Sequence, residues 1–303
     1  METRLLRTFA ALARTGTFTA AAADLHLAQS TVTVQIRALE KELGVRLFDR
    51  LPSGTVLTDA GGRLLERARL VLDAEEELRH EARAAAPLQG RVTLGASESL
   101  CAYRLPLAVA ALGRGLPAVE IHMRPVVTPA EAARHLRSGR IDFALLLEEE
   151  VAEPYVETEV VGHEPLALVA APGHPLAGLA EGEVTAERLG GETYFLLEEG
   201  CSYSDAFARR LAAGPGRPRV TRFGSVEAVR SCVEAGLGLS LLPEVGVRGA
   251  LDAGRLRVVG APGAFPAVAV RMLWLRGLRT APAARTVRDR LRRAAADGWT
   301  VTG

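Results

Sequence analysis

The stretch from Phe18 to Gly44, FTAAAADLHLAQSTVTVQIRALEKELG, constrains the fold of this chain more than any other segment. It predicts a short alanine-rich helix over residues 19–25, a turn at residues 27–29, and a second helix from about Ser30 to Leu43. The apolar residues of the second helix share one face: Val32, Ile36, Leu39 and Leu43. Polar residues occupy the opposite face: Ser30, Thr33, Gln35, Arg37 and Lys41. Such a pair is typical of a helix-turn-helix, whose second helix lies in a major groove of DNA.

The segments on either side of this stretch complete a small domain. An apolar stripe predicts a first helix that ends at Gly16: Leu5, Leu6, Phe9 and Leu12. Residues 52–54 read Pro-Ser-Gly between two short extended pieces, which is a turn signal typical of a β-wing. Residues 1–58 are therefore predicted to form a winged helix-turn-helix domain.

A long amphipathic helix is predicted from about Asp59 to Ala86. Apolar residues recur at every seventh position: Leu64, Val71, Leu78 and Ala85. A single helix cannot bury such a stripe by itself, so the stripe predicts a partner helix. Residues 59–87 are therefore interpreted as a linker through which two copies of the chain dimerise, and Pro87 and Gly90 end it.

From Gly90 onward the pattern changes to alternating strands and helices. The predicted strands lie at residues 91–97, 119–127, 141–147, 166–172, 193–199, 219–225, 239–244 and 267–275. This alternation favours an α/β fold with parallel sheets. Two similar blocks and a late return element predict one two-lobed domain over residues 88–303, with lobe I at about 88–162 and 267–303 and lobe II at about 163–266. Ligands of such folds bind at the carboxyl ends of the strands.

Composition and motif content exclude several classes of protein. The chain contains no run of 18 apolar residues, which argues against a membrane span. Three arginines interrupt the first twenty residues, unlike a secretion signal, and three widely spaced cysteines fit a reducing cytoplasm. The sequence contains no metal-ligand spacing, phosphate-binding loop, dinucleotide-binding glycine pattern or nucleophile elbow. We therefore expect a cytoplasmic protein that uses no cofactor and is not an enzyme.

The whole chain resembles the LysR-type transcriptional regulators. The resemblance is strongest in FAALARTGTFTAAAADLHLAQSTVTVQIRALEKELGVRLFDR and LTDAG, and continues through GRVTLGAS, RLP, PAEAARHLRSGRIDFALL, GHPLA and EAGLGLSLLP. It implies a DNA-binding winged helix joined to a two-lobed effector domain of the periplasmic-binding-protein type. It also implies a tetramer built from two dimers and allows contact with RNA polymerase. Paired recognition helices predict an inverted-repeat operator in double-stranded DNA.

Two features depart from the pattern of that family. Thr33 is followed by Val34, where family members usually have a polar or basic residue. The wing, LPSGTVLT, carries no basic residue, although family members usually have one or more there. Residues 1–60 hold seven Arg and Lys residues against six Asp and Glu residues. The contribution of phosphate contacts to DNA affinity is therefore expected to be modest.

The residues predicted to contact DNA come mainly from the second helix of the motif: Thr19, Gln29, Ser30, Thr33, Gln35, Arg37 and, at the wing, Arg50. Glutamine can bond adenine through two hydrogen bonds, and Ser or Thr can bond bases or phosphates. Simpler interpretations stay open for three of them. Ser30 and Thr19 are also candidates for helix caps, and Arg37 for an ordinary solvated charge.

Small polar residues follow the predicted strands of the two-lobed domain and are predicted to bind an effector: Ser97, Ser99, Thr128, Cys201, Ser202 and Ser225. Because each lies at or just before a helix start, converging helix N-termini predict a site for a small carboxylate or an amino acid. The family resemblance supports Ser99 and Thr128 most directly. Arg104 and Arg124 are candidate counter-charges, whereas Glu98 would repel an acid or pair with the amino group of a zwitterion. Each hydroxyl is alternatively an ordinary cap.

Several alternatives remain open at this point. Cys201 precedes a predicted helix, where a thiol can become reactive, so redox sensing is one alternative to a small buried side chain. A solute-binding protein or an α/β enzyme would also fit the two-lobed domain alone. In a regulator, ligand binding would shift the population between two lobe arrangements, and the linker helices would pass that difference to the DNA.

Overall fold

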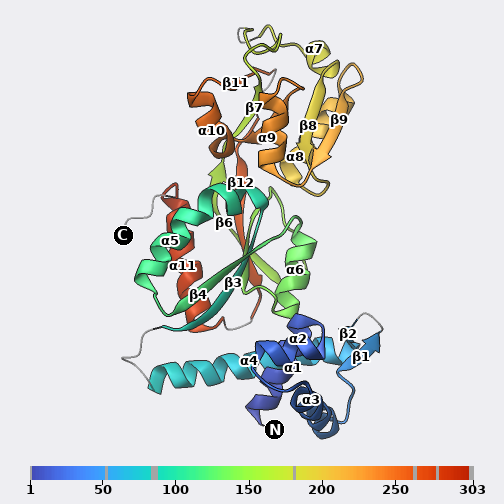
Figure 1. Ribbon diagram of the computed structural model, residues 1–303, viewed down its shortest axis with the longest axis vertical. Helices are drawn as coiled ribbons and strands as arrows, with labels where there is room; N and C mark the ends of the chain where they lie inside the picture. Colours follow the sequence, from blue (N-terminus) through green and yellow to red (C-terminus); the bar gives the residue numbers. More distant parts are fainter. Residues whose placement is uncertain are drawn as a thin grey trace.

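The computed structural model describes residues 2–51, 54–82, 88–179, 182–261, 265–277 and 280–299. Figure 1 shows three bodies in a row: an N-terminal helical domain with a long helix, a central lobe I, and an outer lobe II. The chain passes from lobe I to lobe II and returns, because strand β12 near the C-terminus lies in the sheet of lobe I. This confirms the expected α/β fold class with a separate helical domain at the N-terminus.

The N-terminal domain is a three-helix unit with a two-stranded wing. It consists of α1 (Thr3–Thr15), α2 (Phe18–Asp24), α3 (Gln29–Leu43), β1 (Phe48–Leu51) and β2 (Gly54–Leu57). β1 and β2 pair antiparallel, and the wing turn at residues 52–53 lies outside the described residues. The predicted apolar stripes meet in one core that includes Leu6, Phe9, Leu12, Val32, Ile36, Leu39 and Leu47. The helix-turn-helix prediction is therefore confirmed.

The linker is helix α4, Asp59–Ala82, which begins directly after the wing. The Thr58 hydroxyl caps it by accepting a hydrogen bond from the Gly61 N–H at 2.9 Å. Gly61 allows a close approach, since a Cβ there would lie 2.2 Å from the Leu47 carbonyl oxygen. Leu65 and Ala68 pack into the core of the N-terminal domain. The predicted end of the helix, including Ala85 and Pro87, lies outside the described residues.

Lobe I is built on a five-stranded sheet with the order β4-β3-β5-β12-β6. Its elements are β3 (Gly90–Ala96), a π-helical turn (Leu100–Arg104), α5 (Leu105–Gly115), β4 (Val119–Pro125), α6 (Pro129–Ser138), β5 (Phe143–Leu147), β6 (Val156–Glu164), β12 (Val268–Leu275) and α11 (Pro282–Ala296). β3 pairs parallel with β4 and β5, whereas β12 pairs antiparallel with β5 and β6. The expectation of wholly parallel sheets is therefore wrong, because β12 runs through the sheet in the direction opposite to its two neighbours, β5 and β6.

Lobe II contains two small sheets. One has the order β10-β7-β11 and the other pairs β8 with β9, and a bridge between Tyr194 and Leu239 links them. Its elements are β7 (Leu166–Ala170), α7 (Ala186–Gly190), β8 (Thr193–Leu197), α8 (Ser202–Ala213), β9 (Arg219–Phe223), α9 (Val226–Glu234), β10 (Ser240–Pro243), α10 (Glu244–Asp252) and β11 (Arg257–Val258). β8 and β9 pair parallel, and the bridge between Tyr194 and Leu239 is also parallel, whereas β10 and β11 both run antiparallel to β7.

Candidate DNA-binding surface and interlobe cavity

The exposed surface of α3 carries most of the residues predicted to contact DNA. Gln29 and Ser30 are exposed in its first turn, and Arg37 is exposed two turns later. Between them lie the half-buried Thr33, whose hydroxyl donates to the Gln29 carbonyl at 3.0 Å, and Val34, which is 64% exposed. These five residues recur with helical spacing, so they share one side of α3. We call them the α3 surface.

Three predicted residues differ in position or role from the expectation. Gln35 is half-buried, and its side-chain oxygen accepts a hydrogen bond from the Thr8 hydroxyl of α1, so it faces the domain interior. Ser30 does not cap α3, because the helix begins one residue earlier, after Ala28, with no side-chain cap. Thr19 does not cap α2, because Thr17 accepts the capping bond from the Ala20 N–H at 3.1 Å.

Exposure at the N-terminus of α3 suits nucleic-acid binding. The first N–H groups of a helix have no partner within the helix, and no side chain caps those of α3. These N–H groups can therefore donate hydrogen bonds to a phosphate oxygen. Arg50 lies in β1, but its side chain is outside the described residues, so its predicted contact stays a prediction.

A second candidate site is a cavity of about 150 Å³ between the lobes. Strand ends and connecting loops from both lobes surround it. Its lining residues are Ser97, Glu98, Ser99, Pro125, Val126, Val127, Leu147, Leu197, Glu198, Cys201, Ser202, Tyr203 and Gly224. Four of the six predicted effector residues are thus among them: Ser97, Ser99, Cys201 and Ser202. We call this space the interlobe cavity.

The other two predicted residues lie at helix starts beside the interlobe cavity. Thr128 caps α6, and its hydroxyl accepts a hydrogen bond from the Glu131 N–H at 3.1 Å. Ser225 is the N-cap residue of α9, and its hydroxyl donates to Glu98 at 3.5 Å instead of capping the helix. The cap interpretation therefore describes Thr128, whereas Ser225 serves a contact between the lobes.

Two hydroxyl groups in the cavity wall bond to Leu147 at the end of β5, and one of these bonds joins the two lobes. The Ser97 hydroxyl accepts a hydrogen bond from the Leu147 N–H at 3.1 Å. The Ser202 hydroxyl, from lobe II, donates to the Leu147 carbonyl of lobe I at 2.5 Å. Both serines therefore hold the end of β5 in place. A ligand that entered the cavity would either replace these hydrogen bonds or form further ones beside them.

Sequence reasoning missed two polar residues that line the cavity, Glu198 and Tyr203, whereas Glu98 had been considered beside Ser99. Glu98, from lobe I, accepts long hydrogen bonds from the Ser225 hydroxyl at 3.5 Å and the Val226 N–H at 3.4 Å in lobe II. Burial raises the pKa of Glu98, and the nearby carboxylates Glu227 and Glu198 add to the increase. Glu198 directly follows β8 in the sequence. Because ligands of such folds bind at the carboxyl ends of strands, this position could have identified Glu198 as a candidate.

Neither candidate counter-charge lines the interlobe cavity. Arg104 forms two hydrogen bonds with the carboxylate of Glu164, at 2.8 and 2.9 Å, and the Glu164 side chain is only 1% exposed. Arg124 is exposed on the edge strand β4. The described residues that line the cavity therefore include acidic side chains and no arginine or lysine.

The environment of Cys201 opposes thiol reactivity. Burial raises the pKa of Cys201 to about 12, which overrides the lowering that the start of α8 provides. We expect Cys201 in the folded protein to resist alkylation by iodoacetamide at pH 7.5, because the protonated thiol is a poor nucleophile. Peptide mass spectrometry measures the labelling, and urea-unfolded protein serves as the fully labelled control. Rapid labelling of Cys201 in the folded protein would contradict this prediction and revive redox sensing.

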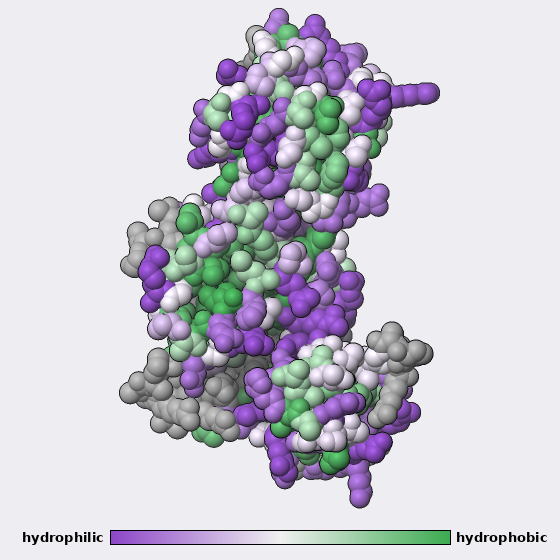
Figure 2. Space-filling model, in the orientation of Figure 1, coloured by the Kyte–Doolittle hydropathy of each residue, from purple (hydrophilic) through white to green (hydrophobic). Residues whose placement is uncertain are grey.

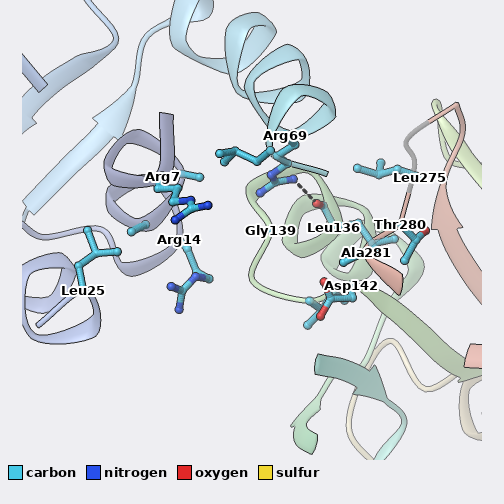
Figure 3. Close-up of a pocket in the computed structure, with 14 residues that line it drawn as sticks. Arg7, Arg14, Leu25, Arg69, Leu136, Gly139, Asp142, Leu275, Thr280 and Ala281 are labelled. Atoms are coloured by element: carbon cyan, nitrogen blue, oxygen red, sulfur yellow. Dashed lines mark hydrogen bonds between the residues drawn. The ribbon is translucent and has the colours of Figure 1, made fainter. Parts of the chain in front are cut away.

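The N-terminal domain and α4 contact lobe I at the end of α6. The Arg69 guanidinium of α4 donates to the carbonyl oxygens of Leu136 at 2.8 Å and Arg137 at 2.7 Å, as Figure 3 shows for Leu136. Arg140, just after α6, donates to the Arg14 carbonyl of α1 at 3.0 Å. A pocket of about 330 Å³ lies beside these contacts and opens between the two domains. We call these contacts the α6 clamp.

Two features are absent from the described part of the chain. Within it, no group of three or more His, Cys, Asp and Glu residues is arranged to hold a metal ion. Across the same ranges, no helix combines the length and the apolarity that crossing a bilayer requires.

The chain is similar to known proteins over most of its length. Residues 3–62 match the model of the bacterial regulatory helix-turn-helix protein, lysR family, and residues 85–296 match the LysR substrate binding domain. The uncharacterized HTH-type transcriptional regulator YwqM of Bacillus subtilis is 35% identical over 257 residues, covering 85% of this chain and 87% of that protein. The RuBisCO operon transcriptional regulator of Allochromatium vinosum is 32% identical over 294 residues, 94% of each. A full-length OxyR variant from Pseudomonas aeruginosa superposes with a TM-score of 0.75 at 26% identity, covering 96% of this chain and 95% of the other.

Proposed function

Since this chain belongs to the LysR family of DNA-binding transcriptional regulators, we propose that a small carboxylate or amino-acid-like ligand in the interlobe cavity switches its transcriptional activity in the cytoplasm. The observation that carries this proposal is the lining of the cavity by both lobes, from Ser97 and Glu98 on one side to Glu198 and Ser202 on the other. A ligand that contacts both lobes stabilises one lobe arrangement over another. Such differential binding is what a ligand-driven population shift requires.

On the DNA side, the α3 surface reads base edges in paired half-sites. The regulators of this family form oligomers, and two surfaces of this chain suit self-association. Val71 and Leu78 on α4 are 42% and 68% exposed, as expected for a helix that dimerises. Figure 2 shows further apolar surface over the α5 side of lobe I, where Leu107 is 73% exposed. We propose a dimer of dimers on an inverted-repeat operator, in reach of RNA polymerase.

Val34 provides an apolar contact with a base at a position where family members usually have a polar or basic residue. An exposed valine on the α3 surface can pack against the methyl group of thymine in the major groove. We expect deoxyuridine in place of one operator thymine to weaken binding about fourfold, the value of one buried methyl group. The Val34→Ala variant should lose this sensitivity. Gel-shift titrations that scan each thymine of the operator test it, and equal affinities at every position would contradict the contact.

Helix α6 offers a route from the interlobe cavity to the DNA-binding domain. At its start, Val127 lines the cavity and Thr128 lies against Gly200 of lobe II, where an added Cβ would come within 2.7 Å of the Thr128 methyl carbon. At its end, the α6 clamp holds the same helix to α4 and α1. A ligand that moves lobe II would therefore act on the DNA-binding domain through one rigid element.

Loss of the α6 clamp should uncouple ligand binding from DNA binding. Arg69→Ala removes two hydrogen bonds to the C-terminal carbonyls of α6, where a cation also offsets the helix dipole. A ligand typically changes the affinity for the second site by about five- to 150-fold. In Arg69→Ala we expect the ligand to leave operator affinity almost unchanged. Gel shifts with and without ligand measure it. Arg67→Ala, an exposed arginine on the same helix, is the matched control, and equal coupling in both variants would contradict the role of the clamp.

The proposed function is tested by a thermal-shift screen of small acids and amino acids on the full-length protein. A ligand that binds the folded state raises the melting temperature by mass action. Every compound that stabilises the protein is then added to gel shifts with the operator. The proposal requires at least one ligand that both raises the melting temperature and changes operator affinity. Binders that leave operator affinity unchanged would contradict it.

A further inference from the structure

The interlobe cavity concentrates negative charge. Glu98 and Glu198 line it from opposite lobes, and Glu227 lies close enough to Glu98 to raise its pKa further. Two arginines on the surrounding elements are engaged elsewhere: Arg104 with Glu164, and Arg222 with Asp205 and the Leu197 carbonyl. A simple carboxylate entering the cavity would meet two like charges without a compensating cation.

The cavity also contains an unsatisfied hydrogen-bond donor. Tyr203 is only 6% exposed and lines the cavity, yet no nitrogen or oxygen atom of the described residues pairs with its hydroxyl. Its polar neighbour is the Cys201 thiol, which is a weak hydrogen-bond acceptor. A buried hydroxyl without a partner is costly, and a bound ligand that accepts its hydrogen bond would remove that cost.

The start of α8 supplies a second place for an acceptor. This helix runs over twelve residues from Ser202, and its N-cap residue Cys201 makes no side-chain cap. Cys201, Ser202 and Tyr203, at the start of this helix, all line the cavity. The cavity lining therefore combines carboxylates with the Tyr203 hydroxyl and the start of a helix, groups that suit the two charges of a zwitterion.

We propose that the interlobe cavity selects small ligands that carry a protonated amino group beside a carboxylate, and that Glu98 is the residue that determines this specificity. The amino group lies between Glu98 and Glu198, and the carboxylate accepts from the Tyr203 hydroxyl and the start of α8. The volume of about 150 Å³ holds about five water molecules, so the ligand is a small aliphatic α-amino acid and not an aromatic one. The inference rests on the proposed function, because it names the ligand class of the same cavity.

Matched probes separate the two charges of the ligand. Each set contains an amino acid, the acid without its amino group and the amine without its carboxylate: glycine with acetate and methylamine, alanine with propionate and ethylamine, and serine with 3-hydroxypropionate and ethanolamine. Binding to the full-length protein is measured by calorimetry and thermal shift. We expect one of the amino acids to bind about ten- to a hundredfold more tightly than its deaminated partner, the value of a hydrogen bond to a charged group.

The Glu98→Gln variant keeps the size of the side chain and its capacity to accept from Val226, and removes its charge. It should lose the preference for the amino acid over the deaminated acid. Glu120→Gln, which changes an exposed carboxylate on β4 outside the cavity lining, should retain that preference and serves as the matched control. The melting temperatures of both unliganded variants establish that they are folded.

Three outcomes would overturn the inference. They are a deaminated acid that binds as tightly as its amino acid, an unchanged preference in Glu98→Gln, and the absence of binding by every probe while the protein still binds its operator. In each case a ligand without an amino group that emerges from the broader screen would leave the proposed function standing. If no ligand of any class changed operator affinity, the proposed function itself would fail.

Discussion

Replacing Glu164 with alanine should destabilise the effector domain by about 3–5 kcal/mol, the usual cost of removing one partner from a buried ion pair. Glu164 is almost fully buried at the end of β6, where the chain leaves lobe I, and it accepts two hydrogen bonds from Arg104. Without the carboxylate, the largely buried guanidinium of Arg104 keeps its charge and loses its partner. Urea unfolding followed by tryptophan fluorescence measures the effect, because both tryptophans, Trp274 and Trp299, belong to this domain.

The matched control is Glu159→Ala on the same strand. Glu159 is 43% exposed and lies 3.6 Å from Arg292, so its loss should cost less than about 1 kcal/mol. Replacing Arg104 and Glu164 together with leucine should cost less than Glu164→Ala alone, because no buried charge is left without a partner. If Glu164→Ala unfolds at the same urea concentration as Glu159→Ala, the buried pair does not stabilise the hinge between the lobes.

The second large effect concerns the α3 surface. Gln29→Ala should weaken operator binding by about five- to 150-fold for each half-site, the value of 1–3 kcal/mol for one bidentate base contact. In a dimer both half-sites lose the contact, so the total reduction is about 25-fold or more. Thr33→Ala should act in the same direction with a smaller effect, because its hydroxyl already bonds to the Gln29 carbonyl. Gel-shift titration measures both.

Salt dependence distinguishes a base contact from a phosphate contact. Glutamine neutralises no phosphate, so Gln29→Ala should leave the slope of log affinity against log salt concentration unchanged. Arg37→Ala should reduce that slope by about one if the arginine contacts a phosphate. Size-exclusion chromatography checks that each variant remains an oligomer. Unchanged operator affinity in both Gln29→Ala and Thr33→Ala would show that a different surface reads the DNA.

The helix-turn-helix could be predicted from the sequence because its determinants are local. The spacing of Val32, Ile36 and Leu39 defines a helix and its buried face within one segment. Gln35 was misjudged because it lies at the border of that face, and only the position of Thr8 on α1 turns it inward. The assignment of caps failed by one or two residues at Thr19 and Ser30, since helix ends are the least determined part of a periodic pattern.

Several features of the two-lobed domain could not be predicted from local sequence patterns. Strand β6 was not predicted because its sequence, VETEVVGHE, alternates charged and apolar residues at the edge of a sheet instead of forming an apolar run. Arg104 was a candidate counter-charge until its partner, 60 residues away, proved to be Glu164. The acidic character of the interlobe cavity likewise depends on Glu98 and Glu198, which line it from different lobes. Their spacing in the sequence does not predict that they share one cavity.

The position of α6 affects the ligand concentration at which this protein would respond in a cell. One end of that ten-residue helix borders the interlobe cavity and the other is held by Arg69. If the helix couples the two sites, thermodynamic reciprocity requires that operator DNA change the affinity for the ligand by the same factor as the ligand changes the affinity for the operator. Molecules bound at a promoter and molecules free of DNA would then respond at different ligand concentrations. The threshold for gene control would be set by the DNA-bound population, so it would differ from one operator to another.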